Sequence, residues 1–279
     1  MGATVGAPGA TLDERYEHLV SLVRSLESVV IGFSGGTDSA LLLKVATDQL
    51  GGRALAITAV SPSFPQRDKR EAVELASEIG ATHLLVDSHE FEQPGYVANA
   101  PNRCFFCKQE LFDILSAVAR ERGFSTIAYG AITDDLGDFR PGMEAARKAG
   151  ARAPLLEAGL GKTDVREISR RLGLKTWDRP ASACLSSRIP HGTPIDAVQL
   201  GRVEQCEDFL LENGFTQVRV RAHGDVARIE CRPADLPRLV EPSLGLRLAA
   251  RFKELGFRYV TVDIEGYRTG SLNPRTDSR

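Results

Sequence analysis

Apolar and polar residues follow two different periods along the first two-thirds of the chain. Short apolar runs predict strands, and they lie at residues 29–33, 54–60, 83–86 and 126–132. Segments with helical spacing of apolar residues lie around and between them, at residues 12–26, 40–50, 71–79 and 108–122. Strands that alternate with helices predict an α/β fold, a doubly wound parallel sheet with helices on both faces.

The order of predicted elements changes after a segment rich in proline, serine and glycine at residues 179–194. Beyond it the patterns are helix, strand, strand, helix and strand, at residues 197–213, 217–222, 227–231, 243–255 and 259–264. This order predicts a smaller C-terminal α+β domain with an antiparallel element. We therefore expect a disordered tail at residues 1–11, a first domain at 12–188 and a second domain at 189–279.

Composition restricts the partners and the compartment. The 279 residues include 35 basic and 37 acidic side chains, a net charge of -2, so no overall field attracts nucleic acid or an anionic membrane. We find neither an apolar run of the ~20 residues needed to cross a bilayer nor a secretion signal at the N-terminus. We expect a cytoplasmic protein, in which cysteines serve metal or sulfur chemistry rather than disulfides.

A glycine-rich loop with the sequence S-G-G-T-D-S occupies residues 34–39, between a predicted strand and a predicted helix. Gly35 and Gly36 allow the backbone to approach a phosphate, and Ser34 and Ser39 offer hydroxyl donors beside the positive end of the helix. The loop lacks the lysine of the P-loop and the spacing of the dinucleotide fingerprint. It therefore predicts an anion site of another kind.

Three cysteines in two segments form a candidate sulfur or metal site: Cys104, Cys107 and Cys184. Cations flank them in the sequence, at Arg103, Lys108 and Arg188. Thiolates are nucleophiles and soft metal ligands, so redox chemistry, a zinc site and a structural role all stay open. A zinc site would need a fourth ligand, for which His191 is the nearest candidate. We expect the other two cysteines, Cys206 and Cys231, to be small buried hydrophobic residues.

Alternate residues of the strand predicted at 217–222 and its end are cationic or titratable: Arg219, Arg221 and His223. Because alternate residues share one face of a strand, the intervening valines would face the core. Two guanidinium groups on one face suit a phosphate, and an ordinary exposed surface is the alternative. The preceding helix carries Glu204 and Glu207. Either could be a carboxylate of the site, but we expect each to be solvated.

The loop at residues 34–39 resembles the S-G-G-x-D-S motif of the PP-loop ATP pyrophosphatases. Residues 130–135 and 154–166 resemble later segments of the same proteins. The resemblance implies that ATP is cleaved between its α and β phosphates and that Asp38 holds Mg²⁺. It also implies a set of residues around the nucleotide, namely Ser34, Gly35, Gly36, Ser39, Gly130 and Lys162.

Further motifs extend the resemblance over nearly the whole chain from about residue 12. N-R-C-x-x-C-K at residues 102–108, W-D-R-P-A-S-A-C-L-S-S-R at 177–188 and G-Y-R-T-G-S at 266–271 resemble the LarE family of ATP-dependent sulfur transferases. The resemblance implies a small-molecule substrate, pyridinium-3,5-biscarboxylic acid mononucleotide, as a precursor of the nickel-pincer nucleotide of lactate racemase. Three arginines would grip the substrate phosphate: Arg188, Arg219 and Arg221.

The resemblance leaves two sulfur sources. Cys184 would give up its own sulfur, or Cys104, Cys107 and Cys184 would hold a [4Fe-4S] cluster whose fourth iron carries a sulfide. The presence of all three cysteines favours the cluster. The alternatives are a PP-loop tRNA thiolase, an ammonia-using ligase of the NAD synthetase kind, and a non-catalytic nucleotide-binding module with structural zinc. We expect a homo-oligomer that binds neither nucleic acid nor membranes.

Overall fold

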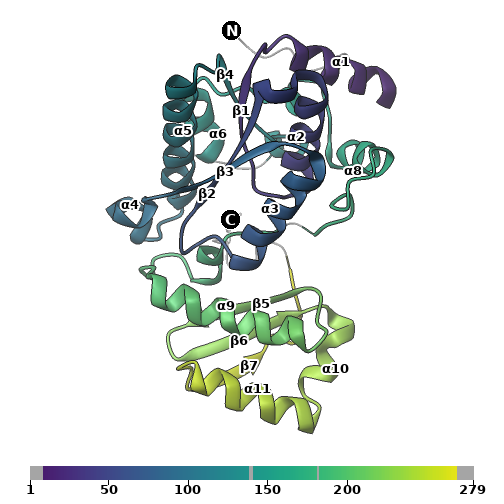
Figure 1. The fold of residues 1–279 in the computed structure, drawn as a ribbon. Coiled ribbons are helices and arrows are strands. Elements are labelled where there is room, and N and C mark those ends of the chain that lie inside the picture. The colour runs from purple at the N-terminus through teal and green to yellow at the C-terminus, as the bar shows by residue number, and fades with distance from the viewer. Residues whose placement is uncertain (1–8, 138–140, 181, 269–279) are drawn as a thin grey trace, which may run out of the picture. The chain divides into compact units, whose positions relative to one another are not determined.

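The computed structural model describes residues 9–137, 141–180 and 182–268 (Figure 1). By their contacts these residues form two units, which we describe separately. Unit 1 comprises Met1–Ser61, Gln66–Glu90 and Cys104–Ser182, and unit 2 comprises Pro62–Pro65, Phe91–Arg103 and Ala183–Arg279. The boundary expected between residues 188 and 189 thus lies at 182/183, and two earlier segments join unit 2. Residues 1–8 of the expected tail lie outside the described residues.

Unit 1 contains the parallel sheet that the sequence predicts. Its strands are β1 (Val29–Gly32), β2 (Ala54–Val60), β3 (Thr82–Asp87) and β4 (Thr126–Tyr129). They pair in the order β3-β2-β1-β4, and all three pairings are parallel. From β1 the chain adds β2 and β3 on one side and then β4 on the other side. The topological switch point therefore lies between β1 and β4. Open α/β sheets bind their ligands at the carboxyl ends of strands at such a point.

Helices cover both faces of this sheet (Figure 1). One face carries α1 (Leu12–Arg24), α2 (Thr37–Leu50), α3 (Gln66–Ile79), α7 (Pro154–Glu157) and α8 (Lys162–Arg171). The other carries α5 (Arg103–Arg122) and α6 (Pro141–Lys148). Neighbouring β1 residues alternate between the two cores, Ile31 in the first and Val30 in the second, because successive side chains of a strand point to opposite faces.

Two helices of unit 1 begin five residues earlier than the apolar pattern predicts. α3 begins at Gln66, directly after Pro65, and its first turn is polar on all sides, so the helical period starts to show only further on. α5 begins at Arg103, and its first turn mixes cysteine and phenylalanine without a polar face. The cysteine pair therefore lies within a helix.

Unit 2 has the α+β order that the sequence predicts. Strands β5 (Val218–His223) and β6 (Val226–Cys231) are antiparallel, and β7 (Tyr259–Val262) runs parallel to β6. The helices of the unit are α4 (Pro94–Val97), α9 (Ala197–Glu212), α10 (Leu236–Leu239) and α11 (Pro242–Glu254). Among the helices of the described residues, we find none with the length and apolar character required to span a bilayer.

Candidate active site

The phosphate loop connects β1 to α2, as its sequence predicts. The hydroxyl oxygens of Ser34 and Ser39 lie 3.3 Å apart, and the Gly36 N–H faces the Ser34 hydroxyl at 3.4 Å. The Ser39 hydroxyl donates to the Gly36 carbonyl (3.1 Å). No side chain caps the N-terminus of α2, whose N-cap is Gly36. Hydroxyl and N–H donors thus gather at the positive end of a helix, which suits an anion.

Two glycines allow the close packing around this loop. Gly35 has φ +71°, and a Cβ there would lie 3.1 Å from the Cβ of Ala72 on α3. A Cβ at Gly130 would lie 2.9 Å from the backbone nitrogen of Ser39. Real Cβ contacts are longer, so the chain after β4 can pass the first turn of α2 only with glycine at this position. The structure thereby brings the residue 130–135 motif against the loop.

Lys162 and Asp38 form an ion pair at the loop. The Lys162 Nζ lies 2.8 and 3.0 Å from the two carboxylate oxygens of Asp38. The backbone N–H of Lys162 donates to Asp134 Oδ2 (2.9 Å), which fixes the start of α8 against the residue 130–135 motif. Three segments that are distant in sequence therefore meet here. The sequence predicts that Lys162 reaches a phosphate, and the structure places its ammonium group on Asp38.

Sequence reasoning missed an arginine that supports the loop from behind. The Arg179 guanidinium donates to the Gly35 carbonyl (3.1 Å) and to Asp68 Oδ1 (3.1 Å), and it contacts Glu71. Asp68 is buried and also accepts a hydrogen bond from the Ser182 hydroxyl. The only signal was the W-D-R-P motif, which contains this arginine but names no partner for it.

Cys104 and Cys107 lie in the first turn of α5, where the sequence suggested a loop before the helix. Residues three apart share one face of a helix, so the two thiols are neighbours. Cys104 is exposed and Cys107 is half-buried.

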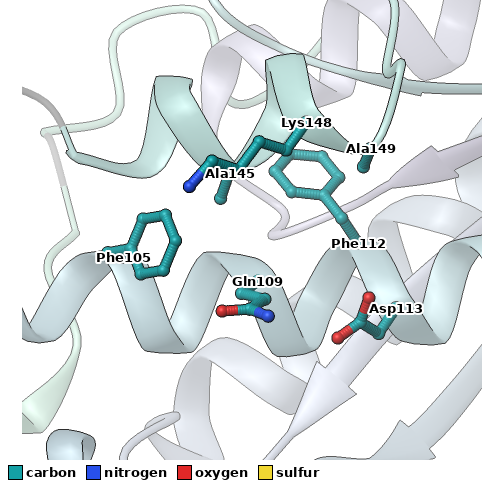
Figure 2. A pocket seen from close by; sticks show the side chains of 7 residues that line it. All are labelled: Phe105, Gln109, Phe112, Asp113, Ala145, Lys148 and Ala149. Carbon is teal, nitrogen blue, oxygen red and sulfur yellow. The ribbon is translucent and has the colours of Figure 1, made fainter.

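A small pocket between α5 and α6 adjoins this cysteine turn (Figure 2). Its lining residues are Phe105, Gln109, Phe112, Asp113, Ala145, Lys148 and Ala149. The Lys148 ammonium lies 4.8 Å from the centroid of the Phe105 ring, a cation–π contact. Phe105, which lies between the two cysteines in sequence, thus anchors the cysteine turn against α6.

Cys184 belongs to unit 2 and directly precedes a 3-10 helix, Leu185–Arg188. It is half-buried. Side chains from the residue 91–103 segment hold this helix: the Tyr96 hydroxyl lies 2.7 Å from the Ser186 hydroxyl, and Arg103 donates to the Ser186 carbonyl (2.9 Å). The loop with Cys184 is therefore fixed within unit 2. The three cysteines predicted to share a cluster come from both units.

Two of the three predicted phosphate-binding arginines are buried in ion pairs. Arg188 donates through Nε and Nη2 to Glu207, both at 2.9 Å, and Arg221 donates to Glu230 at 2.7 Å. Glu230 is fully buried and Glu207 is 8% exposed. The expectation that Glu207 is solvated was wrong, because a buried guanidinium requires a charged partner.

The same arginines also hold the backbone around Cys184. Arg188 donates to the carbonyls of Ala183 (2.6 Å) and Cys184 (3.0 Å), and Arg221 donates to the Ser187 carbonyl (2.9 Å). The arginines of the candidate phosphate site therefore also hold the Cys184 loop in place.

Arg219 is half-buried between groups of both charges. It donates to the carbonyl of Val218 (2.7 Å), and its guanidinium carbon lies 5.3 Å from the ring centroid of Tyr267. Burial and then the positive charge of Arg188 lower the pKa of Arg219. Arg188, Arg219 and Arg221 thus bring three guanidinium groups into one part of unit 2. Guanidinium groups are suited to bind a phosphate.

Replacing Glu207 with glutamine is expected to destabilise unit 2 by about 3 kcal/mol, because Arg188 would keep its burial and lose its counter-charge. Burial opposes ionisation of Glu207, but Arg188 outweighs it and holds the pKa below the usual 4.5. The stabilisation should therefore be complete above about pH 4.5 and decline as the pH falls below it. Urea unfolding at several pH values measures both effects.

Glu212→Gln is the matched control, since Glu212 is an exposed residue at the end of the same helix. Exposed substitutions of this kind change stability by about 0.5 kcal/mol or less. Equal unfolding midpoints for the two variants would contradict a structural role for the Arg188–Glu207 pair.

The remaining cysteines are as predicted. Cys206 and Cys231 are fully buried, which confirms them as core residues. Burial and then the charge of Glu207 raise the pKa of Cys206 to about 12. All five cysteines lie in the described part of the chain, and none is in a disulfide. His191, the candidate fourth zinc ligand, directs Nδ1 to the Asn99 carbonyl at 3.4 Å.

The types of donor atom at these residues match the metal groups that the resemblance implies. The Asp38 carboxylate is partly exposed and already contacts one cation, the Lys162 ammonium, and carboxylate oxygen is the ligand type that Mg²⁺ prefers. Cys104, Cys107 and Cys184 offer three thiols outside any disulfide, the soft donor set of an iron–sulfur cluster. Within the described residues, no three His, Cys, Asp or Glu side chains form a ready metal site, and the cluster stays a prediction.

Comparisons with known proteins agree with this architecture. The family model for NAD synthase matches residues 14–130. An uncharacterised protein of Synechocystis is 45% identical over 94% of this chain and 98% of its own length. A Lactiplantibacillus plantarum protein, pyridinium-3,5-bisthiocarboxylic acid mononucleotide synthase, is 37% identical over 95% of each chain. An uncharacterised protein of Methanocaldococcus jannaschii is 27% identical over 87% of this chain and 92% of its own.

Proposed function

The chain belongs to the family of pyridinium-3,5-bisthiocarboxylic acid mononucleotide synthase, the LarE sulfur transferases. We propose that it catalyses the reaction for which that enzyme is named. It is an ATP-dependent sulfur transferase that converts the carboxylates of pyridinium-3,5-biscarboxylic acid mononucleotide to thiocarboxylates. The product is a precursor of the nickel-pincer nucleotide. The observation that carries the proposal is 37% identity along nearly the whole chain to an enzyme with this name.

The first step is adenylation of a substrate carboxylate. A carboxylate oxygen attacks the α phosphorus of ATP, the bond from the α phosphorus to the bridging oxygen breaks, and pyrophosphate leaves. The Ser34 and Ser39 hydroxyls and the Gly36 N–H bind the pyrophosphate at the start of α2. Mg²⁺, when bound at Asp38, neutralises negative charge on the phosphates. Donors fixed in advance stabilise the departing charge without having to reorganise.

Lys162 supports this step from the end of α8. Its ammonium group contacts Asp38, next to the loop that binds the phosphates. The same carboxylate oxygens would hold Mg²⁺, which would supply positive charge beside the phosphates. The Lys162 ammonium would then be available to a phosphate oxygen, which is the role that the sequence predicts for it.

Three arginines, Arg188, Arg219 and Arg221, bind the substrate phosphate. Arg188 and Arg221 are held in place by Glu207 and Glu230, so their orientation is fixed before substrate arrives. Arg219 adds a third guanidinium group, whose carbon lies 5.3 Å from the ring centroid of Tyr267. Preorganised guanidinium groups bind phosphate at a smaller entropic cost than flexible lysines.

Sulfur transfer follows at Cys184. In the sacrificial route its thiolate attacks the acyl carbon and displaces AMP to form a thioester. Loss of the Cα proton and cleavage of the Cβ–S bond then leave a thiocarboxylate and dehydroalanine at residue 184. A [4Fe-4S] cluster, if held by Cys104, Cys107 and Cys184, would instead supply a labile sulfide. The three-cysteine set favours the cluster.

Iron and acid-labile sulfide analysis of protein purified without oxygen tests the sulfur source. About four of each per chain, lost in Cys184→Ala, is expected for the cluster. Absence of iron from active protein would eliminate the cluster and predict loss of one H₂S from the mass of the chain after turnover. Pyrophosphate release must depend on the pyridinium substrate. Release stimulated by tRNA instead would indicate a thiolase.

The proposal includes the cytoplasm as the compartment, since reduced thiols are required in both sulfur routes. A homo-oligomer and the lack of a nucleic-acid partner stay predictions. The near-zero net charge supports the second of these.

A further inference from the structure

The peptide group between Gly35 and Gly36 faces two different environments. Its carbonyl oxygen accepts a hydrogen bond from Arg179 (3.1 Å). Its N–H, on Gly36, faces the Ser34 hydroxyl at the long distance of 3.4 Å. The C=O and N–H of a planar trans peptide point in opposite directions. A group that holds the carbonyl on one side therefore aims the N–H at the other, toward the Ser34 and Ser39 hydroxyls.

A glycine on each side makes this peptide easy to reverse. Reversal would change ψ of Gly35 and bring φ of Gly36, now -76°, to a positive value. Glycine tolerates positive φ at no steric cost, so neither neighbour opposes the reversal. In the reversed state the carbonyl, not the N–H, would face the pyrophosphate. Repulsion between oxygen atoms would then replace a hydrogen bond.

Arg179 is itself held firmly. Its side chain is 17% exposed, and it pairs with Asp68 and Glu71 of α3. Asp68 is 4% exposed. The same stretch of chain contacts the other side of the loop, where the Thr37 hydroxyl donates to the Thr176 carbonyl (2.8 Å). Thr176 and Arg179, near the end of the last segment of unit 1, thus contact the loop on both sides of the Gly35–Gly36 peptide.

We propose that Arg179 is a positioning residue that fixes the Gly35–Gly36 peptide so that the Gly36 N–H donates to pyrophosphate. The inference rests on the proposed function only in taking the loop as the pyrophosphate site. Arg179 acts through the peptide and contacts neither the reacting carboxylate nor the α phosphorus. Its removal should therefore weaken ligands that occupy the loop and spare those that do not.

Binding of inorganic pyrophosphate and of AMP, measured separately by calorimetry in the presence of Mg²⁺, tests this role. Arg179→Gln is expected to weaken pyrophosphate about tenfold, the effect of one lost hydrogen bond and one nearby charge. AMP affinity should change less than about twofold, because AMP carries no β or γ phosphate. Arg179→Lys, which keeps the charge and one donor, should recover part of the loss.

Arg67→Gln is the matched control. Arg67 lies 3.8 Å from Asp68 and 3.6 Å from Glu71, the same acids that hold Arg179, but its side chain is 41% exposed. This variant should bind both probes as the parent chain does. If Arg179→Gln binds pyrophosphate normally, or loses both probes together with a fall in Tm, the positioning role is overturned.

The amide signal of Gly36 reports on the peptide directly. Pyrophosphate should shift its proton resonance strongly in the parent chain and weakly in Arg179→Gln. Equal shifts in both would overturn the inference. The proposed function fails separately, namely if the parent chain itself binds neither ATP nor pyrophosphate.

Discussion

Replacing Cys184 with serine is expected to abolish thiocarboxylate formation while pyrophosphate release continues. In the proposed mechanism adenylation depends on the phosphate loop of unit 1, whereas Cys184 lies in unit 2. Both sulfur routes require this thiol, as donor or as cluster ligand, and serine offers no sulfur atom. Pyrophosphate release and the mass of the nucleotide product, measured in the same reaction, separate the two steps. No thiocarboxylate product should be detectable.

Cys206→Ala is the matched control for this experiment. Cys206 is buried in α9, and its pKa of about 12 keeps it as an unreactive thiol at neutral pH. This variant should form product and lose some stability from the removed sulfur. Thiocarboxylate production by Cys184→Ser at the parent rate would rule out Cys184 as a part of the sulfur chemistry.

The sheet of unit 1 was predictable because its signals are local. Each strand is an apolar run that ends in polar or glycine residues, as at 29–33 before the loop. Strands that alternate with amphipathic helices leave few arrangements other than a parallel sheet. The starts of α3 and α5 were missed because their first turns carry no apolar period. Their amphipathic character develops only in later turns.

The domain boundary depends on contacts that no local pattern contains. Residues 62–65 and 91–103 belong to unit 2, although they lie between elements of the parallel sheet in sequence. Asn99 shows why: it is fully buried and donates to the carbonyls of Pro190 and Thr193, both at 2.9 Å. Only the folded chain brings that amide to its partners.

The candidate site also combines residues that the sequence identifies with contacts that the sequence does not contain. The motif at residues 34–39 is contiguous, so its donors could be named in advance. The partners of those residues are distant: Arg179 is 144 positions from Gly35, and Lys162 is 124 positions from Asp38. The sequence assigned Lys162 to a phosphate and assigned no role to Arg179. It gave no means of identifying the carbonyl or carboxylate that each contacts.

Replacing Asp38 with asparagine is expected to slow pyrophosphate release about a thousandfold. The change keeps the shape of the side chain and removes the charge that is proposed to hold Mg²⁺, and a metal ion supplies several kcal/mol to a departing phosphate. The fold should be retained, because both side chains of the Asp38–Lys162 ion pair are partly exposed. Such pairs contribute less than about 1 kcal/mol to stability. Initial rates across a series of Mg²⁺ concentrations measure the effect.

Asp48→Asn is the matched control, since Asp48 also lies on α2 and pairs with a lysine, Lys44, at 2.7 Å. It should keep the parent rate. In Asp38→Asn, Lys162 loses its carboxylate and becomes available to phosphate without competition. ATP affinity should therefore fall much less than kcat, and excess Mg²⁺ should restore little activity. A rate within tenfold of the parent at every Mg²⁺ concentration would exclude Asp38 as the metal ligand.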